Sequence, residues 1–236
     1  MLSLKDIDVY IQTSHILRRI SLDVGEREVV CLVGRNGAGK TTALRSIMGY
    51  LKPRAGRISF RGREIQSARS FQIARMGLGF APEDSGIFSD LTVAENIEIS
   101  TWTRATNRPA AERIEQAYQV FPALRRYMAR KGPEMSGGER KMLSIARALA
   151  LDPEMLLLDE PFEGLSPAII PAVSAGIAAI TGLGRAILIA ESNIHHVPEY
   201  TTRLYVIERG EIIFAGPPED AWHDAGVSRI IGGRSR

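Results

Sequence analysis

A glycine-rich octapeptide constrains this chain more than any other feature of its 236 residues. It reads Gly34-Arg35-Asn36-Gly37-Ala38-Gly39-Lys40-Thr41, follows a continuously apolar run and precedes a helical stretch. The spacing matches G-x-x-x-x-G-K-[ST] in the strand-to-helix context that this motif requires. Its glycines let the backbone wrap around phosphate oxygens, and a helix N-terminus points amides at the negative charge. A glycine-rich turn without a ligand is the alternative, but it does not account for the agreement of motif and context.

The last residues of the octapeptide predict what it binds. Lys40 should reach the β- and γ-phosphates of a nucleotide, and the Thr41 hydroxyl should ligate Mg²⁺. We therefore expect ATP and Mg²⁺ as the bound species. The expected ATP-binding residues of this segment are Gly34, Arg35, Asn36, Gly37, Ala38, Gly39, Lys40, Thr41 and Thr42.

A second buried run ends in two carboxylates, Asp159 and Glu160, after Leu156-Leu157-Leu158. Asp159 should hold the Mg²⁺ shell. Glu160 points away from Asp159 on an extended chain, so it can orient and polarise a water in line with the γ-phosphate. The pair could instead cap a helix, but Pro161 directly after it and the phosphate loop upstream argue against that alternative.

A third motif, Met135-Ser136-Gly137-Gly138-Glu139-Arg140, has the features of a helix start. Ser136 and Glu139 have the S-x-x-E spacing of a capping box, and the glycines leave backbone amides accessible to an anion. By itself the segment could be no more than a capped helix.

Together the three motifs resemble those of ATP-binding cassette (ABC) ATPases, whose signature LSGGQ is here MSGGE. The resemblance covers almost the whole chain. It implies an α/β P-loop NTPase fold with a mostly parallel core sheet, an N-terminal antiparallel β subdomain and an inserted helical subdomain. We expect one nucleotide-binding domain over 1–236, with the core in 1–90 and 151–236 and the helical signature subdomain in 91–150.

The same resemblance implies a dimer of two cassettes arranged head to tail. In that arrangement each ATP lies between one subunit's phosphate loop and the other subunit's signature. The signature residues expected to contact the partner's ATP are Ser136, Gly137, Gly138 and Glu139.

Finer details resemble the smaller ATP-binding subunit of branched-chain amino-acid importers. They are Phe80-Ala81-Pro82-Glu83-Asp84 with the following Gly86 to Val93, Glu163-Gly164-Leu165-Ser166-Pro167, and Ile231-Gly232-Gly233 near the end. The implied partners are a second, related cassette, integral membrane permeases and an external solute-binding protein. The implied location is the cytoplasmic face of the membrane. Importers of amides, urea or other amino acids use similar cassettes, so the solute stays open.

Several positions depart from the usual cassette pattern. Glu83 stands where most cassettes have Gln, and it can still ligate or water-bridge to Mg²⁺. Ser192 occupies the switch position where many cassettes carry His. A hydroxyl is shorter than an imidazole and is never cationic, so a dimer with a His-bearing sibling would have unequal sites. The alternative is a homodimer with two equal sites that manage without the switch residue. His195 and His196 lie close by in the sequence. A nearby histidine is more often a surface side chain than a substitute for the missing switch His.

The adenine contact is the least defined part of the expected site. Ile11 falls at the usual aromatic stacking position, with Tyr10 one residue before it. Neighbours on a strand face opposite ways, so Tyr10 can stack only if the strand is shifted or bulged.

Composition narrows the alternatives. The 30 Lys and Arg residues are scattered against 27 acidic ones, a poor footprint for nucleic acid. The single cysteine, Cys31, lies in an apolar run and is expected in the core, and no apolar stretch reaches the roughly 18 residues of a membrane span. A DNA-repair or chromosome-handling ATPase would usually carry coiled coils or zinc modules, for which the chain lacks room and cysteines. A regulatory module that binds ATP without turnover remains an alternative.

Hydrophobic patterning predicts strands separated by helices, and hence a parallel sheet. A helical face joins Ile114, Ala117, Tyr118 and Phe121, and Leu124, Tyr127 and Met128 are expected to extend the packed surface. The predicted strands are 2–10, 20–24, 29–33, 57–60, 77–80, 155–158, 186–189, 204–207 and 211–215.

Overall fold

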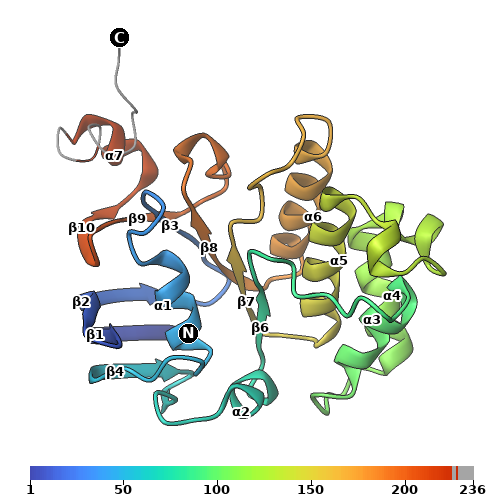
Figure 1. Cartoon of the computed structure of the whole chain (residues 1–236), viewed down its shortest axis with the longest axis horizontal. Coiled ribbons are helices and arrows are strands. Elements are labelled where there is room, and N and C mark those ends of the chain that lie inside the picture. The colour runs from blue at the N-terminus through green and yellow to red at the C-terminus, as the bar shows by residue number, and fades with distance from the viewer. Residues whose placement is uncertain (225–226, 228–236) are drawn as a thin grey trace. The chain divides into compact units, whose positions relative to one another are not determined.

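The computed structural model describes residues 1–224 and 227, and its contacts group them into two compact units (Figure 1). The first unit comprises residues 1–73 and the described residues from Ala186 onward. The second comprises residues 74–185. The predicted motif Ile231-Gly232-Gly233 lies outside the described residues.

An antiparallel sheet forms one part of the first unit, with strand order β2-β1-β4-β5. Its strands are β1 (Leu2–Ile11), β2 (Ser14–Val24), β4 (Ala55–Phe60) and β5 (Arg63–Glu64). Apolar residues alternate with exposed ones along β2, as expected of strands with one packed face. A tight turn joins β4 to β5, and Arg61 and Gly62 both have positive φ, the conformation of a type I′ hairpin.

The core strands of the first unit lie in the order β10-β9-β3-β8. They are β3 (Val29–Val33), β8 (Ala186–Glu191), β9 (Arg203–Glu208) and β10 (Glu211–Gly216). β3 runs parallel to both β8 and β9, whereas β10 returns antiparallel to β9. Every residue of β3 and β8 is buried, which explains their continuous apolar sequence. The helical elements are α1 (Lys40–Ile47), α2 (Ser70–Arg75, which runs into the second unit), η3 (Ile194–His196) and α7 (Pro218–His223).

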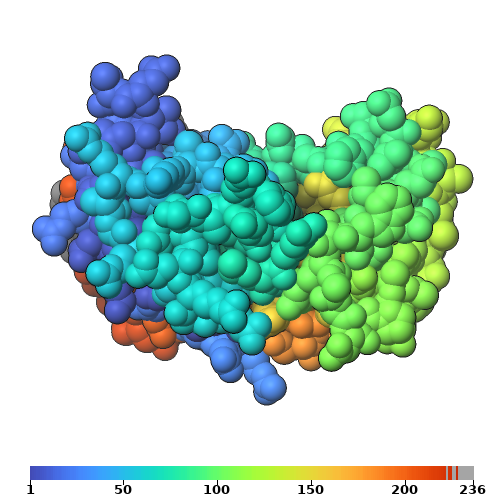
Figure 2. Space-filling view, turned by 90° about the horizontal axis from the view of Figure 1, so that it is seen from below, coloured from blue at the N-terminus to red at the C-terminus, as the bar shows by residue number. Residues whose placement is uncertain are grey.

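The second unit is built around one long helix, α5 (Gly137–Ala150), which contacts the parallel pair β6 (Leu78–Ala81) and β7 (Met155–Asp159). α3 (Val93–Thr101) and α4 (Ala110–Val120) also pack on α5 and on each other, and are coloured green in Figure 2. The remaining elements are η1 (Pro122–Tyr127), η2 (Gly132–Glu134) and α6 (Ile170–Gly182).

Each predicted strand overlaps an observed one, and the antiparallel N-terminal sheet and parallel core confirm the expected fold class. The helical face of α4 is confirmed at Ala117, Tyr118 and Phe121, which are buried. The expectation that Met128 packs in the core is wrong, because its side chain is 41% exposed. Residues 122–127 form a 3₁₀ helix, whose three-residue repeat ends the α-helical face on which the prediction rested.

Cys31 lies in β3 and is fully buried, as predicted. Burial raises the pKa of its thiol to about 12, against the opposing effect of a hydrogen bond with the Thr201 hydroxyl. The thiol therefore stays protonated at neutral pH and acts as a small apolar core group rather than as a nucleophile.

Candidate functional site

The phosphate-loop motif leaves β3 and turns directly into α1. Gly37 and Gly39 have φ of 81° and 116°, conformations that side chains with a Cβ rarely adopt. A Cβ on Gly34 would lie 2.3 Å from the Ile207 carbonyl oxygen, so this glycine is required by close packing against β9. The loop thus needs glycine for two different physical reasons.

Lys40 begins α1 and is only 5% exposed. Its Nζ donates to the carbonyl oxygens of Gly34 at 2.7 Å and Arg35 at 3.2 Å. The ammonium is therefore held beside the loop, next to the first amides of a helix that has no acidic residue in its first turn. Such a cluster of positive potential fits nucleotide phosphates.

The C-terminal end of β8 lies beside the entry to this loop. Glu191 pairs with Val33, and its carbonyl accepts the Gly34 N–H at 3.2 Å. Ser192, the expected switch residue, follows at once and is partly exposed. The motifs did not single out Glu191, yet its carboxylate is fully buried and 3.4 Å from Nδ1 of His196. The sequence signal that could have identified Glu191 is its position as a charged residue at the end of an apolar strand.

Tyr10 and Ile11 end β1 in different surroundings. A register shift lies between Val9 and Tyr10, so the bulge that Tyr10 would need for stacking on a base is present. However, its ring already stacks on His15 at 4.2 Å, and the Arg54 guanidinium lies 5.0 Å from the ring centroid. Ile11 is 43% exposed. Tyr10 thus has partners within the chain, and Ile11 presents an open apolar surface.

The predicted acidic pair lies at the end of β7 in the second unit. Asp159 and Glu160 are 2% and 3% exposed, and Glu160 has a positive φ of 46°. Glu160 therefore lies in the left-handed region of backbone conformation rather than in the extended conformation on which the prediction of its direction rested. Ala81 of β6 pairs with Leu158, so the segment carrying Glu83 leaves the same sheet edge as Asp159. Ligands of parallel sheets bind at this carboxyl edge.

The signature motif begins α5 with the predicted capping box. The Ser136 Oγ accepts the Glu139 N–H at 3.3 Å, and the Glu139 carboxylate accepts the Ser136 N–H at 2.7 Å. Burial opposes ionisation of Glu139, but these hydrogen bonds hold its pKa below the ordinary glutamate value. Outside the adjacent residues and the helix backbone, no described residue lies within 4 Å of a Cβ added to Gly137, whereas a Cβ on Gly138 would lie 2.5 Å from Ile169 Cγ2.

The donor set limits how Mg²⁺ could be held. Among residues 1–224 and 227, no cluster of three or more His, Cys, Asp or Glu side chains could bind a metal. Mg²⁺ needs few protein ligands when phosphate oxygens and waters complete its octahedron. The three predicted ligands, Thr41, Asp159 and Glu83, are too few to complete an octahedron, so the predicted metal site requires the oxygens of a bound nucleotide.

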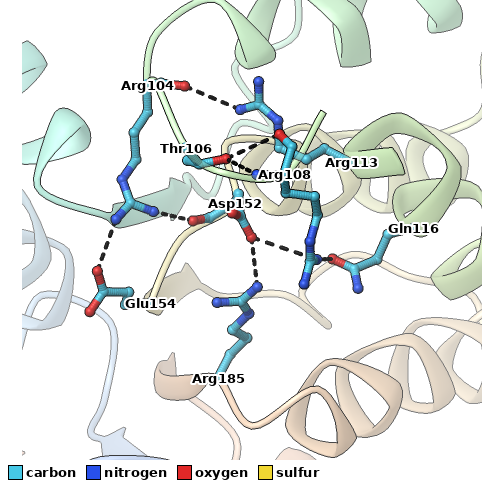
Figure 3. A network of polar contacts seen from close by, with 8 residues as sticks. All are labelled: Arg104, Thr106, Arg108, Arg113, Gln116, Asp152, Glu154 and Arg185. Carbon is cyan, nitrogen blue, oxygen red and sulfur yellow. Dashed lines mark hydrogen bonds and ion pairs between the residues drawn. The ribbon is translucent and has the colours of Figure 1, made fainter. Parts of the chain in front are cut away.

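A separate polar cluster in the second unit surrounds Asp152, as Figure 3 shows. The Asp152 carboxylate accepts from Arg185 at 2.6 Å and is 3.6 Å from Arg108, while its carbonyl accepts from Arg104. Arg104 also pairs with Glu154 at 2.9 Å. The adjoining cavity of about 660 Å³ is lined by three arginines and three acidic residues, so its charges balance. The cluster joins the α3–α4 loop to the segment that starts β7, and we assign it a structural role.

We expect Asp152→Ala to lower the free energy of unfolding by roughly 2–4 kcal/mol, because it leaves Arg185 and Arg108 without their shared, largely buried carboxylate. Urea denaturation of the purified chain measures this change. Asp90→Ala removes an exposed carboxylate and is the matched control, expected within about 0.5 kcal/mol of the parent. Equal stability of both variants would contradict the structural role of the cluster.

The fold and the loop together define a class of protein. A phosphate loop between a buried parallel strand and a helix, with a buried Asp-Glu pair ending another parallel strand, is the architecture of a P-loop nucleoside triphosphatase. The family model described as "ABC transporter" matches residues 17–163, more than half of the chain. The chain belongs to this family and is an ABC-type ATPase, the ATP-binding subunit of a transporter.

Curated relatives point to more than one transport system. The chain is 32% identical over 236 residues to the high-affinity branched-chain amino acid transport ATP-binding protein BraG of Pseudomonas aeruginosa, covering 100% of this chain and 97% of BraG. It is 34% identical to the probable branched-chain amino acid transport protein LivF of Archaeoglobus fulgidus, covering 86% of each. It is also 34% identical to the lipopolysaccharide export protein LptB of Acidithiobacillus ferridurans, covering 91% and 89%.

Solved structures agree on the fold. The ADP conformation of MJ1267, an ATP-binding cassette of an ABC transporter, matches with a TM-score of 0.87 and 25% identity over 99% of both chains. Within the described part of this chain, no helix has both the length and the apolar character needed to cross a bilayer.

Proposed function

We propose that this chain is the ATP-hydrolysing subunit of an importer for branched-chain amino acids or a related small solute. The observation that carries the proposal is the end-to-end match with BraG, which covers all of this chain. The segment Phe80 to Val93, with its FAPED and LTV elements, supports the same branch. The expected partners are a related cassette, integral membrane permeases and an external solute-binding protein, with this chain at the cytoplasmic face.

A lipopolysaccharide exporter is the second candidate function. It is favoured by the 34% identity with LptB, which equals the identity with LivF. The two candidate systems differ in the direction of transport and in the solute. Both of these properties are set by subunits other than the ATPase. The ATPase chemistry of this chain would be the same in either system.

In the proposed catalytic site, the phosphate-loop motif and the acidic pair Asp159 and Glu160 serve one Mg·ATP. Lys40 and the loop amides bind the phosphates, while Thr41, Asp159 and Glu83 hold the metal. Bound Mg²⁺ supplies charge neutralisation at the phosphoryl oxygens. Glu160 orients the attacking water and accepts its proton. Both units would form a single nucleotide-binding domain over 1–236, in which 91–150 is the helical subdomain.

Three further residues have proposed roles at the edges of this site. Ile11 offers its exposed apolar surface to the adenine, and Tyr10 joins it only if the ring leaves His15. Ser192 stands beside the loop entry and reaches the γ-phosphate through a water, because its hydroxyl is short. In a dimer with a sibling that keeps a switch His, the site built on this chain would be the slower.

The signature would contact the nucleotide of the partner subunit. Its Ser136 and Gly137 are exposed at the N-terminus of α5, where backbone amides favour an anion. Among residues 1–224 and 227, the space next to an added Gly137 Cβ is open, which leaves room for a phosphate brought by a second subunit.

Gly137→Ala tests this composite site. In the described part of the chain, the added Cβ has no neighbour within 4 Å outside the adjacent residues and the helix backbone, and alanine is a better helix former than glycine. We therefore expect unchanged or slightly higher thermal stability. The added methyl would occupy the space proposed for the partner's nucleotide, so ATPase activity should fall at least about tenfold. Circular dichroism melting and steady-state ATPase assays measure the two effects. Parent-level turnover in a normally folded Gly137→Ala protein would contradict the composite site.

The transport candidates are separated by reconstitution. The chain is purified with the membrane subunits that co-isolate with it and placed in liposomes. Stimulation of ATPase activity by a binding protein loaded with leucine, isoleucine or valine is expected. Stimulation by lipopolysaccharide, with no response to any loaded binding protein, would replace the importer by the exporter.

A further inference from the structure

A buried lysine of the signature helix holds the segment that carries Glu83. Lys141 lies in α5, is only 4% exposed, and its Nζ donates to the Glu83 carbonyl oxygen at 2.7 Å. A buried ammonium is unfavourable unless it is well paired, so this charge-assisted hydrogen bond fixes both groups. The two residues are 58 positions apart, and the motifs did not indicate the contact.

The other end of the same segment is held independently by α3. Asn96 is fully buried; its Oδ1 accepts the Phe88 N–H at 2.9 Å. Its Nδ2 donates to the carbonyls of Phe88, Leu91 and Thr92. Between these anchors, Ser85 and Gly86 both have positive φ, so the chain makes a tight turn. Glu83 lies on the far side of that turn from Asn96, two residues after the end of β6, and Lys141 supplies a side-chain hydrogen bond to it there.

The same helix that carries Lys141 begins at the signature. Lys141 follows the N-cap Ser136 by five residues, about 7.5 Å along the axis of a helix. Arg147, further along α5, places its guanidinium 5.1 Å from the Phe88 ring centroid. A displacement of α5 would therefore be transmitted to the Glu83 segment at two points.

We propose that Lys141 is a positioning residue that fixes Glu83 relative to the signature end of α5, so that the state of the signature sets the metal site. This inference rests on the proposed function, in which the signature contacts the partner's ATP and Glu83 serves the Mg·ATP of its own chain. One hydrogen bond thereby connects the two ATP sites of the dimer.

Lys141→Met tests the proposal, because it keeps an apolar stem of similar shape and removes the ammonium. Hydrogen–deuterium exchange of the nucleotide-free chain should show at least about fivefold faster exchange of the amides at 83–87. Amides at 92–97 should be unchanged, because Asn96 holds that part. Lys141→Arg restores a cationic donor and should bring exchange back toward the parent rate. Lys52→Met, at an exposed lysine, is the control for losing one charge.

Activity supplies the second readout. With ATP saturating, the Mg²⁺ concentration for half-maximal ATPase activity should rise about five- to tenfold in Lys141→Met, while ATP affinity without Mg²⁺ stays at the parent value. Faster loop exchange with an unchanged Mg²⁺ requirement would overturn the positioning role. Parent-level loop exchange in Lys141→Met, or exchange in Lys141→Arg as fast as in Lys141→Met, would overturn the holding contact itself. The exchange experiment contains no nucleotide, so its result does not depend on the proposed function; loss of that function would instead appear as parent-like ATP binding in Lys40→Ala.

Discussion

Lys40→Ala should weaken Mg·ATP binding by at least about 100-fold, which corresponds to a loss of about 2.7 kcal/mol or more. The ammonium lies against the loop carbonyls of Gly34 and Arg35, at the start of α1, and is the fixed cation of the phosphate loop. Charge-assisted hydrogen bonds contribute about 1.5–3 kcal/mol each, so losing contacts to the β- and γ-phosphates accounts for an effect of this size. Equilibrium titration with a fluorescent ATP analogue measures the affinity.

The matched control for this experiment is Lys52→Ala. Lys52 is exposed and lies after α1, so its removal changes the net charge equally without touching the loop. The control should bind Mg·ATP as the parent does. If Lys40→Ala also retained the parent affinity, the nucleotide would have to bind elsewhere on the chain.

Glu160→Gln should lower the rate of ATP hydrolysis by about 10²- to 10⁴-fold while ATP binding is retained. Glutamine has the shape of glutamate but cannot accept a proton, and the residue is 3% exposed at the end of β7. With hydrolysis blocked, Mg·ATP should accumulate between two subunits and trap a dimer across the signature helices. Single-turnover assays measure the rate, and size-exclusion chromatography with light scattering measures the dimer.

Glu219→Gln is the control for the charge change, because Glu219 is exposed in α7. It should hydrolyse ATP at the parent rate and form no ATP-dependent trapped dimer. Hydrolysis at the parent rate in Glu160→Gln would show that Glu160 is not the catalytic carboxylate. Asp159 or a water bound to the metal would then be tested in its place.

Local sequence determined the elements that carry the candidate site. The strands β3, β7 and β8 could be predicted because strands buried on both faces must be apolar throughout. The start of α5 could be predicted because Ser136 and Glu139 satisfy each other's backbone amides within four residues. The phosphate loop could also be predicted from local sequence, because its glycines are required by backbone conformations that are set within a few residues.

Only the tertiary structure decided which polar and aromatic groups meet. How the elements pack or pair decides three contacts: Lys141 with the Glu83 carbonyl, Glu191 with His196, and the Tyr10 ring on His15. The exposure of Met128 depends on where the apolar face of α4 ends. Periodicity reports which face of an element is apolar, but it carries no information on the partner of a single polar group. Burial makes those partners obligatory, because an unpaired buried charge is costly, yet which group supplies them is set by packing across the fold.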